Sequence, residues 1–151
     1  MDITGNQKIK APRQQVFQAL LDPETLRNSI PGCESAEIID FPTGPQLKLV
    51  VSPNIPGFKG SHTVFLQTIQ VVPPSRVVLA AQPTSSVGSI DATCVVDLEE
   101  DAQSTNLSYN AHAEMQGKIA AMPDMILKGA VKVALDQFFK NFEKQVDSAK
   151  V

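Results

Sequence analysis

The sequence has few aromatic side chains and no tryptophan. Phe, Tyr and Trp together make up 5% of the 151 residues, with a single tyrosine. Lysine and arginine number 13 against 16 aspartate and glutamate residues, which leaves a net charge of −3. Nucleic-acid-binding domains normally present a basic surface, and single-strand binders add aromatic stacking platforms. We therefore expect no nucleic-acid partner.

Cysteine and histidine are scarce, with two residues of each type. Cys33 and Cys94 allow at most one disulfide bridge, so a disulfide-based scaffold is excluded. His62 and His112 are too few for a histidine-rich metal site. The sequence also has no phosphate-binding loop, nucleophile elbow or Cys-x-x-Cys motif. We therefore expect no catalytic constellation, no metal ion and no cofactor.

Long apolar runs are absent as well. No stretch of about 18 apolar residues is present, and residues 1–10 lack the apolar core of a signal peptide. The sequence therefore predicts a cytoplasmic protein. Hydrophobic residues still make up 42% of the chain and charged residues 19%. This composition is typical of one globular domain, which we expect to span residues 1–151.

Proline and glycine positions predict two short helices after a first strand over Ile3–Ile9. Pro12 suits the first turn of a helix because its missing N–H costs nothing there. In Asp22-Pro23, the aspartate can cap a second helix and the proline can take its first position. Pro31-Gly32 then ends this helix.

Alternating apolar and polar residues predict six further strands. Their expected ranges are Ala36–Asp40, Gln46–Ser52, Lys59–Gln70, Arg76–Gln82, Gly88–Leu98 and Thr105–Glu114. The residues from Glu99 to Asp101 are predicted to form a polar turn. Ile55–Phe58 resembles a hairpin turn. Its apolar tip either contacts a membrane, a partner protein or an entering ligand, or is exposed by chance.

From Lys118 to Val146 the apolar period changes to that of a helix, with Pro123 starting or kinking it. Two apolar rows on this helix form a face broad enough to lie across a sheet. The order of elements therefore predicts an α+β fold in which a curved antiparallel sheet grips one long helix.

Several blocks of residues resemble the family of carbon monoxide dehydrogenase G subunits, within the START/polyketide-cyclase superfamily. They are Ala11–Phe17, Asp22–Leu26, Ile30–Glu34, Pro73-Pro74, Val96–Glu100 and Asp136–Phe139. The resemblance implies the helix-grip fold, with a seven-stranded antiparallel sheet wrapped around the C-terminal helix. It also implies a cavity between sheet and helix that holds a lipid, a quinone or a similar hydrophobic molecule.

The same resemblance implies partners. Proteins of this family are associated with molybdenum hydroxylases, which they are thought to help reach the membrane or its quinone pool, or to mature. We therefore expect a molybdenum hydroxylase partner, a monomer or dimer, and at most peripheral contact with the inner face of the membrane. Family members of this kind are generally not regarded as catalytic, so we expect no enzymatic activity.

Ten residues are predicted to line the ligand cavity by shape and apolar burial. They are Leu26, Ile30, His62, Val64, Ile90, Tyr109, Met122, Met125, Ile126 and Gly129. His62 would point inward if Val64 does, and either anchors a ligand oxygen or bonds to the protein backbone. Tyr109 either presents its hydroxyl to a ligand or packs with the hydroxyl reaching the rim.

Other residues favour structural interpretations. Three small residues that face inward, Gly5, Gly88 and Ala111, are expected to leave space for the cavity. His112 and Glu114 share a polar strand face, which is typical of a solvated surface. Cys94 is expected in the core and Cys33 as an inert thiol.

Two other functional hypotheses remain open at this stage. One is a cavity enzyme of the polyketide cyclase or hydrolase type, which would need ionisable side chains inside the cavity. The other is an assembly factor that binds a protein partner and no ligand. The sequence does not separate this second hypothesis from the carrier hypothesis.

Overall fold

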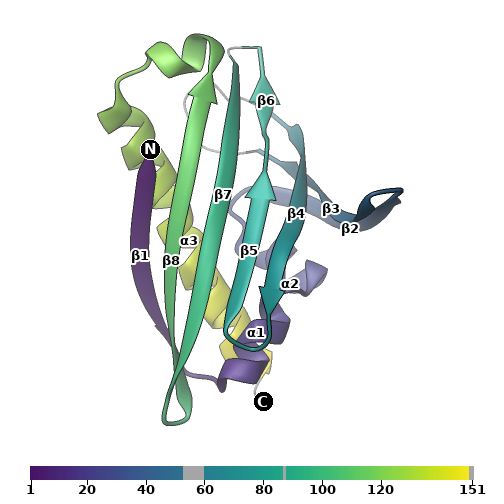
Figure 1. Cartoon of the computed structure of the whole chain (residues 1–151), viewed down its shortest axis with the longest axis vertical. Helices are drawn as coiled ribbons and strands as arrows, with labels where there is room; N and C mark the ends of the chain where they lie inside the picture. The colour runs from purple at the N-terminus through teal and green to yellow at the C-terminus, as the bar shows by residue number, and fades with distance from the viewer. Residues whose placement is uncertain (53–59, 87, 150–151) are drawn as a thin grey trace.

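The computed structural model describes residues 1–52, 60–86 and 88–149, and Figure 1 shows the arrangement of its elements. The predicted Ile55–Phe58 turn lies outside these residues. In chain order the elements are β1 (Asp2–Ile9), α1 (Arg13–Leu20), α2 (Pro23–Ser29), β2 (Cys33–Phe41), β3 (Gly44–Val51), β4 (His62–Val72), β5 (Arg76–Ala81), β6 (Thr84–Ser85), β7 (Gly88–Asp101), β8 (Ser104–Gln116), the 3-10 helix η1 (Gly117–Ala121) and α3 (Asp124–Ala149).

The sheet is antiparallel and follows the order β1-β8-β7-β5-β4-β3-β2. The two-residue strand β6 pairs with β7 beside this path. Helix α3 runs along one face of the sheet, and α1 and α2 lie at one end (Figure 1). These features confirm the predicted α+β helix-grip fold with seven main strands and a long C-terminal helix.

The local signals at α2 act as the sequence predicts. The Asp22 carboxylate accepts a hydrogen bond from the backbone N–H of Thr25 at 3.1 Å, and Pro23 occupies the first helical position. The helix ends at Ser29, with Ile30 as its cap. This short connection directs the chain into β2, so that α2 lies across the end of the sheet.

One predicted turn is wrong. Residues 99–101 continue β7, where Glu100 pairs with Thr105 and Asp101 with Ser104 of β8. The chain reverses at Ala102, whose φ is 57°. Residues 99–101 are all exposed, so polar side chains are compatible with a strand there.

The final helix also starts later than predicted. Residues 117–121 form the separate helix η1, and α3 begins at Asp124. Pro123 stands just before α3, and its carbonyl accepts hydrogen bonds from the N–H groups of Ile126 and Leu127. Pro123 therefore starts the helix, as one of the two predicted alternatives states.

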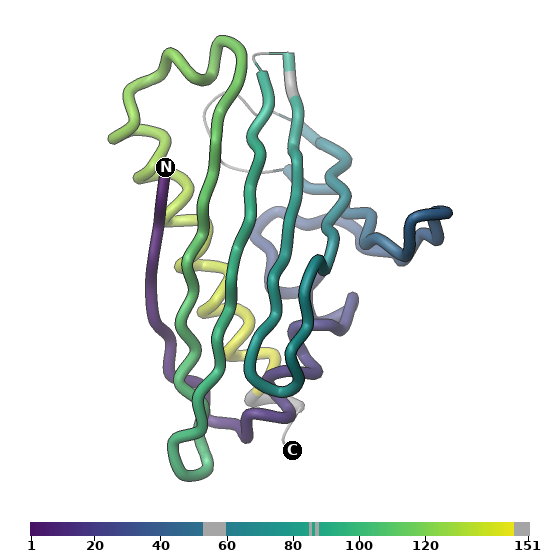
Figure 2. The backbone as a smooth tube through the Cα atoms, viewed as in Figure 1, coloured from purple at the N-terminus to yellow at the C-terminus, as the bar shows by residue number. Residues whose placement is uncertain are grey.

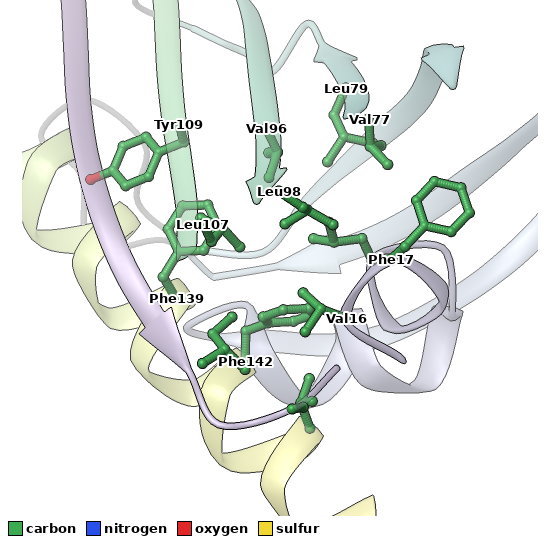
Figure 3. Packing of buried hydrophobic residues seen from close by; sticks show 14 of the residues in the cluster. Val16, Phe17, Val77, Leu79, Val96, Leu98, Leu107, Tyr109, Phe139 and Phe142 are labelled. Atoms are coloured by element: carbon green, nitrogen blue, oxygen red, sulfur yellow. The ribbon is translucent and has the colours of Figure 1, made fainter. Parts of the chain in front are cut away.

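The main hydrophobic core lies at the end of the molecule where α1 meets α3. Figure 3 shows Phe139 and Phe142 of α3 facing Val16 and Leu107, with the sheet around them. Two smaller clusters stand apart from it. One surrounds Leu127 and Ile119 at the start of α3, and the other surrounds Leu26 beneath β3.

The β2–β3 hairpin (dark blue in Figure 2) extends beyond the rest of the sheet. Ile38 pairs with the buried Leu47, so both side chains are on the inner face of the sheet. Ile38 is nevertheless exposed because the hairpin projects past the helices. The outer part of the hairpin therefore lies beyond the packed core, whereas Leu49 and Val51 of β3 are buried in it.

Candidate functional site

A cavity of about 540 Å³ lies between the sheet and α3. Strands β3, β4, β5, β7 and β8 contribute inward side chains to one wall, while α3 forms the opposite wall and α2 closes one end. On α3 the cavity borders solvent at Val133 and Gln137, because both residues line it and both are exposed, Val133 to 69%. Ligand pockets in proteins typically have volumes of about 300–1,000 Å³.

Small side chains create this volume. Six alanines that line the cavity face inward, namely Ala81, Ala92, Ala111, Ala113, Ala130 and Ala134. They come from three neighbouring strands and from the facing helix. Side chains of ordinary core size at these positions would meet across the gap, as they do in the packed end of the molecule.

The prediction that Gly5 and Gly88 would leave space is wrong. The ring of Tyr109 lies over Gly5, where an added Cβ would stand 2.5 Å from the tyrosine oxygen. Gly88 lies against the carbonyl of Gln116 and the side chain of Ile119. Of the three small residues proposed, Ala111 is the one that lines the cavity.

Five of the ten predicted site residues line the cavity. Leu26 and Ile30 contribute from α2 and the residue that follows it, His62 and Val64 from β4, and Ile90 from β7. His62 pairs with Val51 across the sheet, and both residues line the same cavity. The side chain of His62 therefore faces the cavity, as expected if Val64 does.

Met122, Met125, Ile126 and Gly129 lie outside the cavity. The inward placement predicted for Met125 and Ile126 is wrong, since these side chains are 85% and 52% exposed. The face of α3 that lines the cavity contains Leu127, Ala130, Val131 and Ala134 instead. The row through Ile126 turns toward solvent because the wall of the sheet covers only part of this broad apolar face.

Tyr109 packs with its hydroxyl at the rim, which is the second of the two predicted alternatives. Its ring is buried, stacked on Phe139 at a centroid distance of 4.5 Å. Lys132 Nζ donates to the tyrosine oxygen at 2.9 Å, and the hydroxyl donates to Asp136 Oδ1 at 3.3 Å. Figure 3 shows this hydroxyl (red) beside the β1 ribbon.

The polar cluster of Tyr109, Lys132 and Asp136 joins α3 to the edge of the sheet. Lys132 Nζ also donates to the backbone carbonyl of Thr4 at 3.2 Å and lies 3.1 Å from Asp136 Oδ1. The hydrogen bonds to Tyr109 and Asp136 raise the pKa of Lys132, so the ammonium form is stabilised. These contacts hold the middle of α3 against β1.

His112 lies on the outer, solvated face of the sheet, as predicted. Its Nδ1 is 2.7 Å from Asp2 Oδ1 and its Nε2 is 3.3 Å from Glu114 Oε1. The hydrogen bond to Asp2 raises the pKa of His112 and lowers the pKa of Asp2. Within the described part of the chain, no group of His, Cys, Asp and Glu side chains is suited to hold a metal ion.

The two cysteines are free thiols. Cys94 lines the cavity, and burial raises its pKa to about 11, so the thiol stays protonated at neutral pH. Burial also raises the pKa of Cys33, whose Sγ donates to the carbonyl of Ser35 at 3.3 Å. Both environments are those of unreactive thiols, in agreement with the sequence-based expectation.

Sequence reasoning did not identify Val133 as the residue at the mouth of the cavity. The signal was present, because Met125, Ile126, Gly129 and Val133 recur on one face of a helix at spacings of three and four residues. Together these four residues form an exposed apolar stripe on the first half of α3. In the described residues no helix is long and apolar enough to cross a membrane.

Several solved structures share this fold. A conserved protein from Geobacillus kaustophilus is 27% identical with a TM-score of 0.87, and the match covers 99% of this chain and 97% of that one. A START superfamily protein from Mycobacterium smegmatis is 16% identical with a TM-score of 0.75, over 98% of both chains. A protein from Thermus thermophilus is 14% identical with a TM-score of 0.74, over 100% of both chains.

The comparison with curated proteins found no match. A family model for the G subunit of carbon monoxide dehydrogenase (CoxG) matches residues 5–147, from the first strand to the last turns of the long helix. Because that match spans nearly the whole chain and the fold agrees, this protein belongs to the CoxG family of carbon monoxide dehydrogenase G subunits and has the START-like helix-grip fold.

Proposed function

We propose that this protein is a carrier that holds a hydrophobic small molecule in the cavity between its sheet and α3. The observation that carries the proposal is the cavity itself, about 540 Å³ enclosed mainly by apolar side chains. A small domain gains stability by packing its core, and an unfilled volume of this size costs stability unless a ligand occupies it. The CoxG family and the START-like fold also suggest a protein that binds a hydrophobic ligand.

We further propose that the ligand is a lipid or a quinone-like molecule, and that the protein serves a molybdenum hydroxylase of the carbon monoxide dehydrogenase type. The support for this partner is the family to which the chain belongs. The exposed apolar stripe of α3 supports peripheral contact with a membrane, because Met125 and Val133 are mostly exposed and Lys128 lies beside them on the helix. Such contact at the inner face of the membrane would deliver an apolar ligand without exposing it to water.

In this proposal the protein binds its ligand and does not transform it. A cyclase or hydrolase would need acidic or basic groups positioned around the reacting atoms. In the described wall of the cavity, Asp and Glu side chains are absent, and His62 is the inward-facing ionisable group apart from the Cys94 thiol, whose raised pKa keeps it neutral. These features support a carrier over a cavity enzyme.

The test is native mass spectrometry of the purified protein, followed by solvent extraction of whatever is bound. We expect a mass excess that matches an apolar molecule. Two variants narrow the cavity from opposite walls, Ala92→Phe on β7 and Ala134→Phe on α3, and each should abolish the mass excess while circular dichroism shows a folded protein.

The matched control is Val95→Phe, which adds the same ring to β7 on the outer face of the sheet, where residue 95 pairs with Asn110. This variant should retain the bound molecule. A mass excess that survives both cavity variants would mean that the ligand binds elsewhere. A wild-type protein that carries nothing and binds no apolar probe would contradict the carrier proposal and favour an assembly factor.

A further inference from the structure

The lining of the cavity carries no formally charged Asp, Glu, Lys or Arg side chain among the residues that the structure describes. Four polar residues border it, namely His62, Thr93, Gln137 and His112. The remaining lining side chains are apolar or, in the case of Cys94, a protonated thiol. The electrostatic character of the site therefore depends on where these four polar side chains point.

Two of the four polar side chains point away from the cavity. Thr93 and His112 pair with each other across β7 and β8, between the inward residues Ala92 and Cys94 on one strand. Strand alternation places them on the outer face. The ring of His112 is engaged there with Asp2 and Glu114. The polar side chains that remain are His62 and Gln137, and Gln137 is exposed.

Two positive charges near the cavity are hydrogen-bonded to protein groups. Lys132 is bonded to Tyr109, Asp136 and the carbonyl of Thr4 on the side of β1. The α-amino group of Met1 donates to the carbonyl of Ala113 at 2.9 Å. Lys132 already has a carboxylate partner in Asp136, and an anionic headgroup would have to displace the Met1 ammonium from the Ala113 carbonyl to pair with it. The transfer of an unpaired ion into an apolar site is strongly unfavourable.

We propose that the cavity selects its ligand by charge and accepts electrically neutral molecules while rejecting anionic amphiphiles of the same size. This inference rests on the proposed carrier function and narrows it to one ligand class. The class is that of uncharged, largely apolar molecules, with any hydrogen-bonding group placed near His62 and Gln137. Free fatty acids in their carboxylate form, acyl phosphates and sulfonated amphiphiles fall outside it.

The test uses two probes that share one aromatic skeleton. N-phenyl-1-naphthylamine is neutral, whereas 8-anilino-1-naphthalenesulfonate carries a sulfonate that stays ionised at all working pH values. Both probes fluoresce when they enter an apolar site, so their affinities can be measured by titration at about pH 8. We expect the neutral probe to bind more tightly than the sulfonate by more than about 100-fold, because the sulfonate must be desolvated without a partner.

The variants Ala92→Phe and Ala134→Phe identify which binding occurs in the cavity. If the neutral probe binds and both variants abolish its binding, the carrier function stands and the affinity ratio decides the charge inference. Equal affinities for the two probes, both lost in the cavity variants, would overturn the inference and leave the carrier function intact. Failure of the neutral probe to bind in the cavity would contradict the carrier function itself.

Two further variants test the electrostatic origin of the selection. Gln137→Lys places a cation at the exposed mouth and should raise the affinity for the sulfonate probe severalfold, whereas Gln103→Lys in the β7–β8 turn should leave it unchanged. Equal effects of the two lysines would overturn the inference, since a general change in net charge would then explain both. The variant His62→Asn gives a second way to overturn the inference. If the sulfonate probe binds in the cavity and this variant abolishes the binding, the imidazole of His62 serves as the counter-charge of the sulfonate.

Discussion

Gly5 of β1 pairs with Tyr109 of β8, and the position of the tyrosine ring depends on the glycine. The tyrosine ring can lie flat over β1 because position 5 has no side chain, and its hydroxyl then reaches Lys132 and Asp136 at the rim. The glycine needs no unusual backbone conformation at this position, because its role is steric. A single missing methyl group thus allows the bonds that join α3 to the sheet edge.

At this residue scale we predict that Gly5→Ala destabilises the protein by about 1–3 kcal/mol, because the new Cβ would overlap the tyrosine ring. Urea unfolding measures this loss. The loss should largely disappear in a Tyr109→Val background, where the ring is absent, which gives a coupling energy above about 1 kcal/mol. Asn6→Ala at the next, exposed position serves as the control and should change stability by less than about 0.5 kcal/mol. Additive effects of the two changes would contradict this account.

Helix α3 is a single element with two different environments along its length. Its second half is held by Phe139, Phe142 and Val146, all buried in the main core. In its first half Leu127 is buried, while Met125 and Val133 are mostly exposed. The same helix therefore contributes core packing at one end and the wall and mouth of the cavity at the other.

At the scale of this element we predict opposite outcomes for two truncations. Phe142→Ala should cost about 3–5 kcal/mol, because the side chain is completely buried and its removal leaves a void. Met125→Ala should change stability by less than about 0.5 kcal/mol, since that side chain is 85% exposed. Thermal or urea unfolding distinguishes the two outcomes. A comparable loss in both variants would mean that the first half of α3 is packed as tightly as the second.

The whole molecule is packed at its ends and hollow in the middle. Three separate clusters of buried residues surround the cavity, which is bordered by a row of alanines. The protein thus retains an apolar space that a fully packed core would fill. An apolar ligand in that space adds contacts that the unliganded protein lacks.

At this scale we predict that the neutral probe N-phenyl-1-naphthylamine stabilises the folded protein. At about 100 times its Kd, the probe should raise the free energy of unfolding by about 2.7 kcal/mol, because it binds the folded state alone. Thermal unfolding with and without the probe measures this shift. Ala134→Phe should remove the shift, and Val95→Phe should keep it. A shift of equal size in Ala134→Phe would place the binding outside the cavity.

Much of the candidate site could be predicted from the sequence, and the reasons are local. The alternation in β7 correctly indicated that Ile90 faces inward, since a strand has only two faces. In β4 both faces carry apolar residues, and the structure places the face of Val64 inward. Helical phase is harder to predict, because several apolar rows on α3 compete for the same wall. Met125 and Ile126 therefore turned out to be exposed, and Val133 at the mouth was not identified.

The sequence by itself determined the order of the main strands and helices, the cap at Asp22, the helix start at Pro23 and the family, because each depends on neighbouring residues or on a pattern along the chain. The tertiary structure alone decided that the tyrosine ring occupies the space beside Gly5, which face of α3 meets the sheet and where the cavity opens. These features depend on distances between segments far apart in the chain. Sheet curvature and side-chain packing set those distances, and no local pattern encodes them.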